Sequence, residues 1–325
     1  MRKLLIVAAG LALAGCAGMS SDPQAPKVKV TPLGSHDGEF CPLDRAMVFE
    51  DPDGTRILYD PGRTVRGPDD PRLGRIDAVL LSHVHGDHLG DLIQPSANAG
   101  ACPKPDFSVN VTPNSNFVNI SMGKQAPMVV GGEMSSFFQA KVKSLGGDPN
   151  KLVRLLRFGA QTLFGKVMVA SVPAVHANGL PAAFLPKEQA QAIGSSGLTA
   201  YVGPPGGFVL RFSNGLTAYL SGDTGITAEQ DLVVRGHYKA NMVVMNIGGF
   251  PFTTGPDEAA YVVNDLVRPA SVIASHANEP ATVGGKLSPA SRTAAFQKRA
   301  KMPVHVPLSG RTMEFDGSGR CTAGC

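Results

Sequence analysis

The first part of the chain alternates short apolar runs with turn residues, a pattern that predicts strands. Residues 46–49 and 55–59 flank Asp53-Gly54, a pair that favours a tight hairpin turn. Residues 75–82 end in an almost unbroken apolar run, which is typical of a strand covered on both faces. We therefore expect an antiparallel hairpin followed by a buried strand.

Strand patterns continue later in the chain. Residues 208–212 and 216–220 predict a second hairpin through Asn214-Gly215, whose residues tolerate the positive φ of a tight turn. Further strands are expected at 167–172, 242–246, 271–275 and 311–315.

Helices are predicted between these strands. One lies between Pro256 and Pro269, over residues 257–267, and another extends from a cap at Ser288-Pro289 to about residue 299. Strands with interspersed helices indicate an α/β domain in which sheets and helices form layers.

The region from 94 to about 150 is less regular and rich in Pro, Asn and Gly, but it contains one amphipathic helix at 133–145. The apolar face of this helix comprises Met134, Phe137, Phe138, Val142 and Leu145. Such a face usually packs in the core. Because the helix falls between two of the candidate ligand groups described below, a lid or a substrate wall is the alternative.

The N-terminus has the features of a secretory signal, with Arg2 and Lys3 before an apolar run at 4–14. That run is too short to span a bilayer as a stable helix, which takes about 20 apolar residues. Leu13-Ala14-Gly15-Cys16 resembles the lipobox of bacterial lipoproteins, in which the chain is cut before a cysteine that becomes lipidated. An ordinary signal peptide with an incidental cysteine is the alternative.

These features predict three segments. Residues 1–15 form the signal peptide, residues 16–30 a flexible tether that is anchored to a membrane through Cys16, and residues 31–325 the globular domain. The expected location is a bacterial membrane surface, facing the periplasm.

Composition and charge narrow the class of protein. Apolar residues make up 43% of the chain and charged residues 17%, which supports a sizeable core. The net charge of +4 falls to about +2 once Arg2 and Lys3 leave with the signal, so no nucleic-acid partner is expected.

Besides Cys16, four cysteines remain in a chain that we expect in an oxidising compartment: Cys41, Cys102, Cys321 and Cys325. Disulfides are therefore predicted, in any of three pairings, with free buried thiols as the alternative.

The most specific feature is the run Ser82-His83-Val84-His85-Gly86-Asp87-His88, which places four potential metal ligands within six residues. Residues two apart at a strand end can point to one side, and Gly86 allows the chain to turn and return Asp87 and His88. Imidazole nitrogen and carboxylate oxygen are ligands that zinc prefers. A histidine-rich surface turn is the alternative, but the whole chain has only eight histidines.

The pattern His83-x-His85-x-Asp87-His88 resembles the motif of the metallo-β-lactamase superfamily. The remaining ligand positions of that family follow in order as His176 in Val-Pro-Ala-Val-His, Asp223 in Leu-Ser-Gly-Asp-Thr-Gly and His276 in Ala-Ser-His. Asp60, in Tyr-Asp-Pro-Gly, is similar to an early strand-end Asp that supports the ligands. The resemblance implies an αββα sandwich with its site at the strand ends.

The resemblance also implies which residues bind each of two metal ions. One ion would be held by His83, His85 and His176, the other by Asp87, His88 and His276, and Asp223 would join them. Zinc is the expected cofactor, although manganese or iron can occupy similar sets.

Two such ions can share a water and lower its pKa toward about 7, so that a metal-bound hydroxide is available at neutral pH. Asp87 and Asp223 are the expected catalytic carboxylates, with Asp87 orienting the hydroxide. The expected activity is that of a metallohydrolase.

The kind of substrate is narrowed by Asp223. Zinc β-lactamases do not carry Asp at the bridging position, whereas lactonases, thioesterases, phosphodiesterases and nucleases do. The segments around Asp223 and His176 look most like those of the ascorbate-phosphate lactonase and N-acyl phospholipid hydrolase branch. We expect a small-molecule lactone or ester as substrate, with phosphodiesters or phospholipids as the alternative and β-lactams less favoured.

A non-catalytic metal-binding lipoprotein is the least favoured hypothesis, because purely structural zinc sites are usually four-coordinate and closed. Ser121-x-x-Lys124 also resembles the serine β-lactamase motif, but the accompanying Ser-Asp-Asn and Lys-Thr-Gly are missing from the sequence.

Three further histidines have weaker signals. His36 lies where one branch of the superfamily has Gly-His, but Ser35 is interposed here, so a site residue and a surface turn are both open. His237 and His305 have no supporting motif, and we expect structural or solvated side chains.

Overall fold

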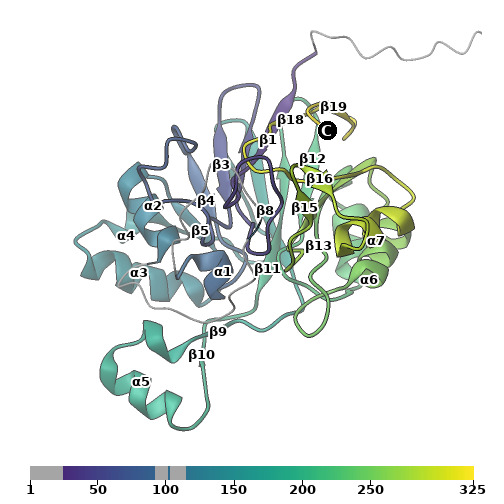
Figure 1. The fold of residues 1–325 in the computed structure, drawn as a ribbon. Coiled ribbons are helices and arrows are strands. Elements are labelled where there is room, and N and C mark those ends of the chain that lie inside the picture. The colour runs from purple at the N-terminus through teal and green to yellow at the C-terminus, as the bar shows by residue number, and fades with distance from the viewer. Residues whose placement is uncertain (1–24, 92–101, 103–114) are drawn as a thin grey trace, which may run out of the picture.

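The structure is a computed structural model that describes residues 25–91, 102 and 115–325. Two sheets lie face to face in the middle of the molecule, with helices on both outer sides (Figure 1). This arrangement is the αββα sandwich, so the fold predicted from the sequence is confirmed. No helix in the described part of the chain is long and apolar enough to span a membrane.

The first sheet has mixed strand directions and runs in the order β19-β18-β1-β2-β3-β4-β5-β6. Its strands are β1 (Val28–Pro32), β2 (Met47–Glu50), β3 (Arg56–Tyr59), β4 (Ala78–Leu80), β5 (Met128–Val130), β6 (Val153–Leu155), β18 (Met313–Phe315) and β19 (Cys321–Ala323). Helices α1 (Gly86–Leu89), α2 (Asn116–Lys124), α3 (Met134–Ser144) and α4 (Pro149–Leu152) lie on its outer side.

The second sheet runs in the order β17-β14-β13-β12-β11-β8-β7. Its strands are β7 (Gln161–Phe164), β8 (Val167–Pro173), β11 (Gly206–Arg211), β12 (Thr217–Leu220), β13 (Met242–Asn246), β14 (Ser271–Ser275) and β17 (Val304–His305). Its outer side carries α6 (Pro256–Tyr261), α7 (Arg292–Arg299) and the π-helical segments η2 (Gln230–Arg235) and η3 (Val262–Val267). A short hairpin of β15 (Thr282–Val283) and β16 (Lys286–Leu287) follows β14.

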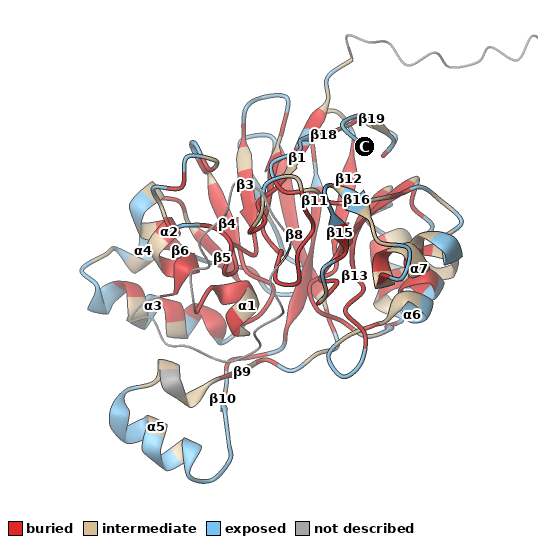
Figure 2. Ribbon diagram, in the orientation of Figure 1, coloured by how far each residue is buried: buried red, intermediate tan, exposed pale blue. Residues whose placement is uncertain are grey.

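Strand side chains build the core because successive residues point to opposite faces. In β3, Ile57 packs between the sheets, whereas Leu58 faces the helix layer of the first sheet. In β13, Val244 packs between the sheets and Val243 faces the helices of the second sheet. Strands buried on both faces need apolar residues at every position, which explains the unbroken apolar runs in the sequence. Figure 2 shows this buried interior along the sheets.

Most predicted elements are confirmed, with shifted ends. The hairpins are β2–β3 and β11–β12, and the strand expected at 75–82 is the shorter β4. The helix expected at 257–267 begins as α6 and continues as η3.

The predicted start of the last helix is wrong. Helix α7 begins at Arg292, because the Ser291 hydroxyl, rather than Ser288, caps it by accepting a hydrogen bond from the N–H of Ala294. The folded region also begins earlier than the expected boundary at residue 31, because β1 begins at Val28 and pairs with β2 and β18.

The helix expected at 133–145 is α3, and it packs in the core rather than over the site. Met134, Phe138 and Val142 are buried in one cluster with Phe117 of α2, whereas Leu145 is exposed. The other part of the region from 94 to 150, residues 94–101 and 103–114, lies outside the described residues, as do the predicted signal peptide and Cys16.

One excursion leaves the body of the sandwich between β8 and β11 (Figure 1). It consists of β9 (Gly179–Leu180), the 3-10 helix η1 (Ala182–Phe184), α5 (Lys187–Gly194) and β10 (Ala200–Tyr201). Helix α5 has no buried residue, and Figure 2 shows it as an exposed element below the sandwich.

Candidate metal centre

Five of the seven predicted ligands follow strand ends at one edge of the sandwich: His83, His85, His176, Asp223 and His276. Parallel strands β3 and β4 of the first sheet end just before Asp60 and the His83 motif. In the second sheet, His176 follows β8, Asp223 follows β12 and His276 follows β14. Because both sheets end here, residues far apart in the sequence meet in one place.

The short helix α1 returns Asp87 and His88 toward the strand ends. It ends at Gly90, whose backbone is left-handed with a φ of 79° and whose N–H donates to the carbonyl of Gly86. A β-carbon at Gly90 would lie 2.3 Å from the carbonyl oxygen of Gly62, so only glycine allows the chain to pass so close.

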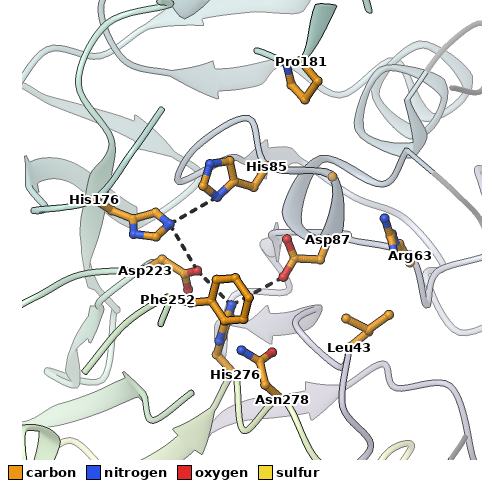
Figure 3. A pocket seen from close by; sticks show the side chains of 11 residues that line it. Leu43, Arg63, His85, Asp87, His176, Pro181, Asp223, Phe252, His276 and Asn278 are labelled. Atoms are coloured by element: carbon orange, nitrogen blue, oxygen red, sulfur yellow. Dashed lines mark hydrogen bonds and ion pairs between the residues drawn. The ribbon is translucent and has the colours of Figure 1, made fainter. Parts of the chain in front are cut away.

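The ligand side chains form two overlapping groups. One ligand atom from each residue lies within 4.8 Å of the others in the set His83, His85 and His176, and in the set Asp87, His88 and His276. Asp223 lies between the two sets, with its Oδ2 3.7 Å from His176 Nε2 and 2.8 Å from His276 Nε2. Its Oδ1 lies 3.4 Å from His88 Nε2. Figure 3 shows His176, Asp223, His276 and Asp87 facing one another across the site.

Asp60 and Ser82 orient two of the imidazoles. Asp60 Oδ2 lies 2.7 Å from His88 Nδ1, and Ser82 Oγ lies 2.9 Å from His83 Nδ1. Asp60 in turn accepts hydrogen bonds from the backbone N–H and the hydroxyl of Ser82. Such partners fix the ring orientation of histidines that bind metal ions and leave the opposite nitrogen available.

Several buried polar atoms at this centre have no hydrogen-bond partner. They include His83 Nε2, His88 Nε2 and Asp223 Oδ1. Buried polar atoms without a partner are rare in native proteins and need an explanation, such as a bound ion. These atoms point into one group of histidines and carboxylates, so the donor set fits divalent cations such as zinc.

The protonation of most ligands favours cation binding. Burial lowers the pKa of His83 well below its usual value, and burial also lowers the pKa of His176 to about 4. Burial acts to raise the pKa of Asp223, but the nearby imidazoles of His276 and His88 outweigh it and hold that pKa well below the usual range. Neutral imidazole and ionised carboxylate are the forms that bind metal ions.

The pKa of His88 is shifted in the opposite direction from those of His83 and His176. Burial acts to lower its pKa, but the carboxylates of Asp223, Asp87 and Asp60 outweigh burial and raise the pKa to about 10. Without a cation, this imidazole therefore carries the positive charge that compensates the buried carboxylates.

Arg45 is a site residue that the sequence analysis missed. Its side chain is buried, and its Nε and Nη2 donate to Asp87 Oδ2 at 3.1 and 3.0 Å. Its Nη2 also donates to Asn278 Oδ1 at 2.5 Å. Arg45 thus fixes both the Asp87 carboxylate and the Asn278 amide.

A cavity of about 180 Å³ opens over the centre. Three partly exposed ligands, His85, Asp87 and His176, face it. The other lining residues are Leu43, Arg63, Gly86, Pro181, Asp223, Phe252, His276 and Asn278. A reactant that enters the cavity therefore meets the candidate ligands directly (Figure 3).

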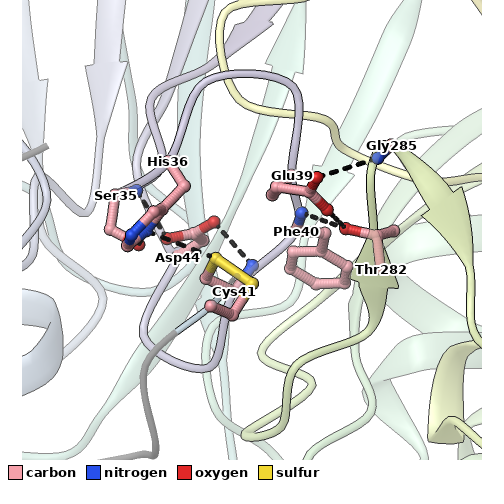
Figure 4. Close-up of a disulfide and its surroundings, with 9 residues drawn as sticks. Ser35, His36, Glu39, Phe40, Cys41, Asp44, Thr282 and Gly285 are labelled. Atoms are coloured by element: carbon pink, nitrogen blue, oxygen red, sulfur yellow. Dashed lines mark hydrogen bonds between the residues drawn. A yellow bond between two sulfur atoms is a disulfide. The ribbon is translucent and has the colours of Figure 1, made fainter. Parts of the chain in front are cut away.

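The structure does not bring the other predicted candidates to the centre. His36 does not line the cavity; its Nδ1 lies 3.1 Å from Ser35 Oγ, beside the disulfide between Cys41 and Cys102 (Figure 4). The second disulfide joins Cys321 and Cys325. Ser121 is buried and its hydroxyl donates to the carbonyl of Ala126.

The two remaining histidines also lie away from the cavity. His237 is exposed, and His305 is partly buried on β17.

The sandwich and the ligand set define a protein of the metallo-β-lactamase class. A family model described as the metallo-beta-lactamase superfamily matches residues 45–94, which include the His83 motif. Among relatives, a UPF0173 metal-dependent hydrolase of Cupriavidus taiwanensis is 30% identical over 275 residues, which cover 81% of this chain and 82% of the relative. Another UPF0173 metal-dependent hydrolase, from Myxococcus xanthus, is 29% identical and covers 95% of this chain and 97% of its own. The chain therefore belongs to the UPF0173 family of metal-dependent hydrolases within the metallo-β-lactamase superfamily.

Solved structures share the fold. A metallo hydrolase from the archaeon Ignicoccus hospitalis has a TM-score of 0.57 at 19% identity and covers 89% of this chain and 99% of its own. An isothiocyanate hydrolase from Delia radicum gut bacteria has a TM-score of 0.54 at 17% identity, with the same coverage.

Proposed function

We propose that this chain hydrolyses a lactone or ester with the help of two divalent metal ions, zinc in the first instance. The observation that carries the proposal is the position of Asp223, whose two carboxylate oxygens face His176 and His276 on one side and His88 on the other. A carboxylate that faces both groups of imidazoles is suited to hold two cations near each other.

Two sets of residues would each hold one cation. His83, His85 and His176 would hold one ion, Asp87, His88 and His276 the other, and Asp223 would contact both. When bound, such ions supply a hydroxide nucleophile at neutral pH and stabilise negative charge on the attacked oxygen.

Asp87 would contribute to the reaction through Oδ1, the carboxylate oxygen that Arg45 does not contact. Arg45 holds Oδ2, so Oδ1 can accept a hydrogen bond from the attacking water and orient it toward the substrate. Asp87 is partly exposed and lines the cavity, as this role requires.

Carbonyl chemistry is favoured over phosphoryl chemistry by the charges around the cavity. Arg63 contacts Asp91 through Nε and Nη2 at 2.6 and 2.9 Å, and Arg45 contacts Asp87. These two arginines are already bound to carboxylates, whereas enzymes that transfer phosphoryl groups commonly direct Arg or Lys at phosphate oxygens. Phosphodiester or phospholipid hydrolysis is the alternative activity of the same site.

The test compares initial rates of the zinc-loaded full chain on an acyl-homoserine lactone and on bis(4-nitrophenyl) phosphate, with Asp223→Asn as the control. We expect turnover of the lactone, none of the phosphodiester, and loss of turnover in the variant. Turnover of the phosphodiester alone would replace the proposal with the alternative. Full lactonase activity in Asp223→Asn would refute the role of that carboxylate.

We also propose that the protein is exported and held at a membrane through a lipid on Cys16, facing the periplasm. The support is the basic and apolar N-terminus followed by Leu-Ala-Gly-Cys. Replacing Cys16 with Ser should release the protein from the membrane fraction. Unchanged membrane association of Cys16→Ser would contradict the lipid anchor.

A further inference from the structure

The cavity over the metal centre has an apolar wall that the proposed chemistry does not use. Leu43, Pro181 and Phe252 line the cavity together with the ligands. They come from three separate segments, namely the loop before β2, the start of the excursion after β9, and the loop after β13. Figure 3 shows them around the polar centre, with Phe252 in front of His276 and Asp223.

Hydrogen bonds within the loops of Leu43 and Phe252 hold these two residues of the wall in place. The loop of Leu43 is braced because Asp44 accepts from the backbone N–H groups of Ser35 and Cys41. The loop of Phe252 is closed because its N–H donates to the carbonyl of Gly249 at 2.9 Å. A preformed apolar wall binds a ligand without the cost of ordering the loops.

The size of the cavity limits what can bind there. An apolar cavity of about 150 Å³ accepts a benzene-sized molecule. The cavity here is about 180 Å³ and must also contain the reacting group. A compact substituent therefore fits beside the reacting group.

Charge limits the substituent further. Among the described lining residues, the cation is Arg63, which contacts the carboxylate of Asp91, and Asp87 contacts Arg45. A carboxylate on the substituent would lose its hydration against Leu43 and Phe252 without gaining a partner among the described wall residues, which is unfavourable.

We infer that the substrate carries a compact, uncharged apolar substituent, which packs against Leu43, Pro181 and Phe252 while the reacting group lies at the metal centre. This inference rests on the proposed hydrolysis of lactones or esters. It assigns Phe252 as a residue that determines specificity. Burial of each added methylene favours binding by about fourfold.

The test uses the zinc-loaded full chain and three γ-lactones: unsubstituted γ-butyrolactone, its ethyl-substituted homologue, and a homologue of similar size whose side chain ends in a carboxylate. Phe252→Ala removes the aromatic part of the wall and leaves Leu43 and Pro181 in place. Phe250→Ala is the matched control, because Phe250 is 93% exposed, does not line the cavity and lies in the same loop. Zinc content is measured for every variant.

We expect kcat/KM of the wild type to rise by about fifteenfold from the unsubstituted to the ethyl lactone, which adds two methylene-sized groups. The carboxylated homologue should show no such rise. Phe252→Ala should lose most of the rise, whereas Phe250→Ala should behave as the wild type.

The outcomes separate this inference from the proposed function. Zinc-dependent hydrolysis with equal kcat/KM for all three lactones, or equal effects of Phe252→Ala and Phe250→Ala, would overturn the inference and leave the hydrolase function intact. Failure of the zinc-loaded wild type to open any of the lactones would overturn the proposed lactonase function and the inference with it.

Discussion

Replacing Asp60 with Asn tests how the protein prepares a histidine for metal binding. A carboxylate only accepts hydrogen bonds, so the short contact between Asp60 Oδ2 and His88 Nδ1, at 2.7 Å, places the proton on Nδ1. When the imidazole gives up its second proton, from Nε2, the lone pair of that nitrogen is available for a cation. Asp60 is fully buried, so water cannot take over this role.

In Asp60→Asn, the amide has only one accepting oxygen. If that oxygen keeps the hydrogen bond from the backbone N–H of Ser82, the amide N–H₂ faces His88 Nδ1 and favours the wrong tautomer. Mutation of such supporting groups typically costs about 10- to 100-fold in metal affinity. At about 1.4 kcal/mol for each factor of ten, this corresponds to roughly 1.4 to 2.8 kcal/mol.

The assay is zinc competition against a chromophoric chelator, with Asp51→Asn as the matched control. Asp51 is a buried carboxylate at the other end of the β2–β3 hairpin, where it accepts from the backbone N–H and hydroxyl of Ser213, both at 2.7 Å. Both variants should lose stability, but only Asp60→Asn should lose zinc affinity. Equal zinc affinities of the two variants would show that Asp60 does not prepare His88 for zinc.

Three further predictions concern Arg45, Asp44 and the metal requirement. Arg45→Met leaves the Asp87 carboxylate without its arginine partner. Urea denaturation of the metal-free chain should therefore show that the free energy of unfolding falls by about 3 kcal/mol. An unchanged denaturation midpoint would contradict a stabilising contact between Arg45 and Asp87. Burial raises the pKa of Asp44 from 3.8 to about 6, so the folded state binds this proton more tightly than the unfolded state. The free energy of unfolding should therefore fall by about 2 kcal/mol as the pH rises from about 4 to about 6, and Asp44→Asn should remove this slope. An identical slope in the variant would show that Asp44 is not the group that titrates. Dialysis against a chelator should abolish hydrolysis and zinc should restore it, whereas activity that persists in the metal-free chain would exclude a metal-dependent reaction.

The candidate ligands were predictable from the sequence because their signals are local. The His83 motif places three histidines and an Asp within a short segment, and Asp223 and His276 each follow an apolar strand run. A polar residue at the end of a buried strand faces the edge of the sheet, where the other strand ends also meet. The local sequence pattern and the topology of the sheets therefore predict the same location for the site.

The remaining site residues depend on contacts between distant segments. Arg45 and Asn278 are 233 residues apart, and nothing in the sequence around Arg45 distinguishes a buried arginine from a solvated one. The cavity wall likewise combines Leu43, Pro181 and Phe252 from separate loops. Loop conformation is set by tertiary packing, so periodicity could not assign these residues.

Short elements were missed for a related reason. Strands β5 and β6 contain three residues each, which is too few for a periodic pattern to emerge. The start of α7 was misplaced because Ser288 and Ser291 are both suitable caps, and only the structure distinguishes them.

The number of zinc ions bound per chain is the most direct test of a two-metal site. The purified full chain would be equilibrated with zinc, freed of excess ion, and analysed for metal by mass spectrometry alongside Asp223→Asn. We expect two ions per wild-type chain and a lower number in the variant, because Asp223 faces both groups of candidate ligands. A wild-type chain that binds only one ion would contradict the two-metal mechanism.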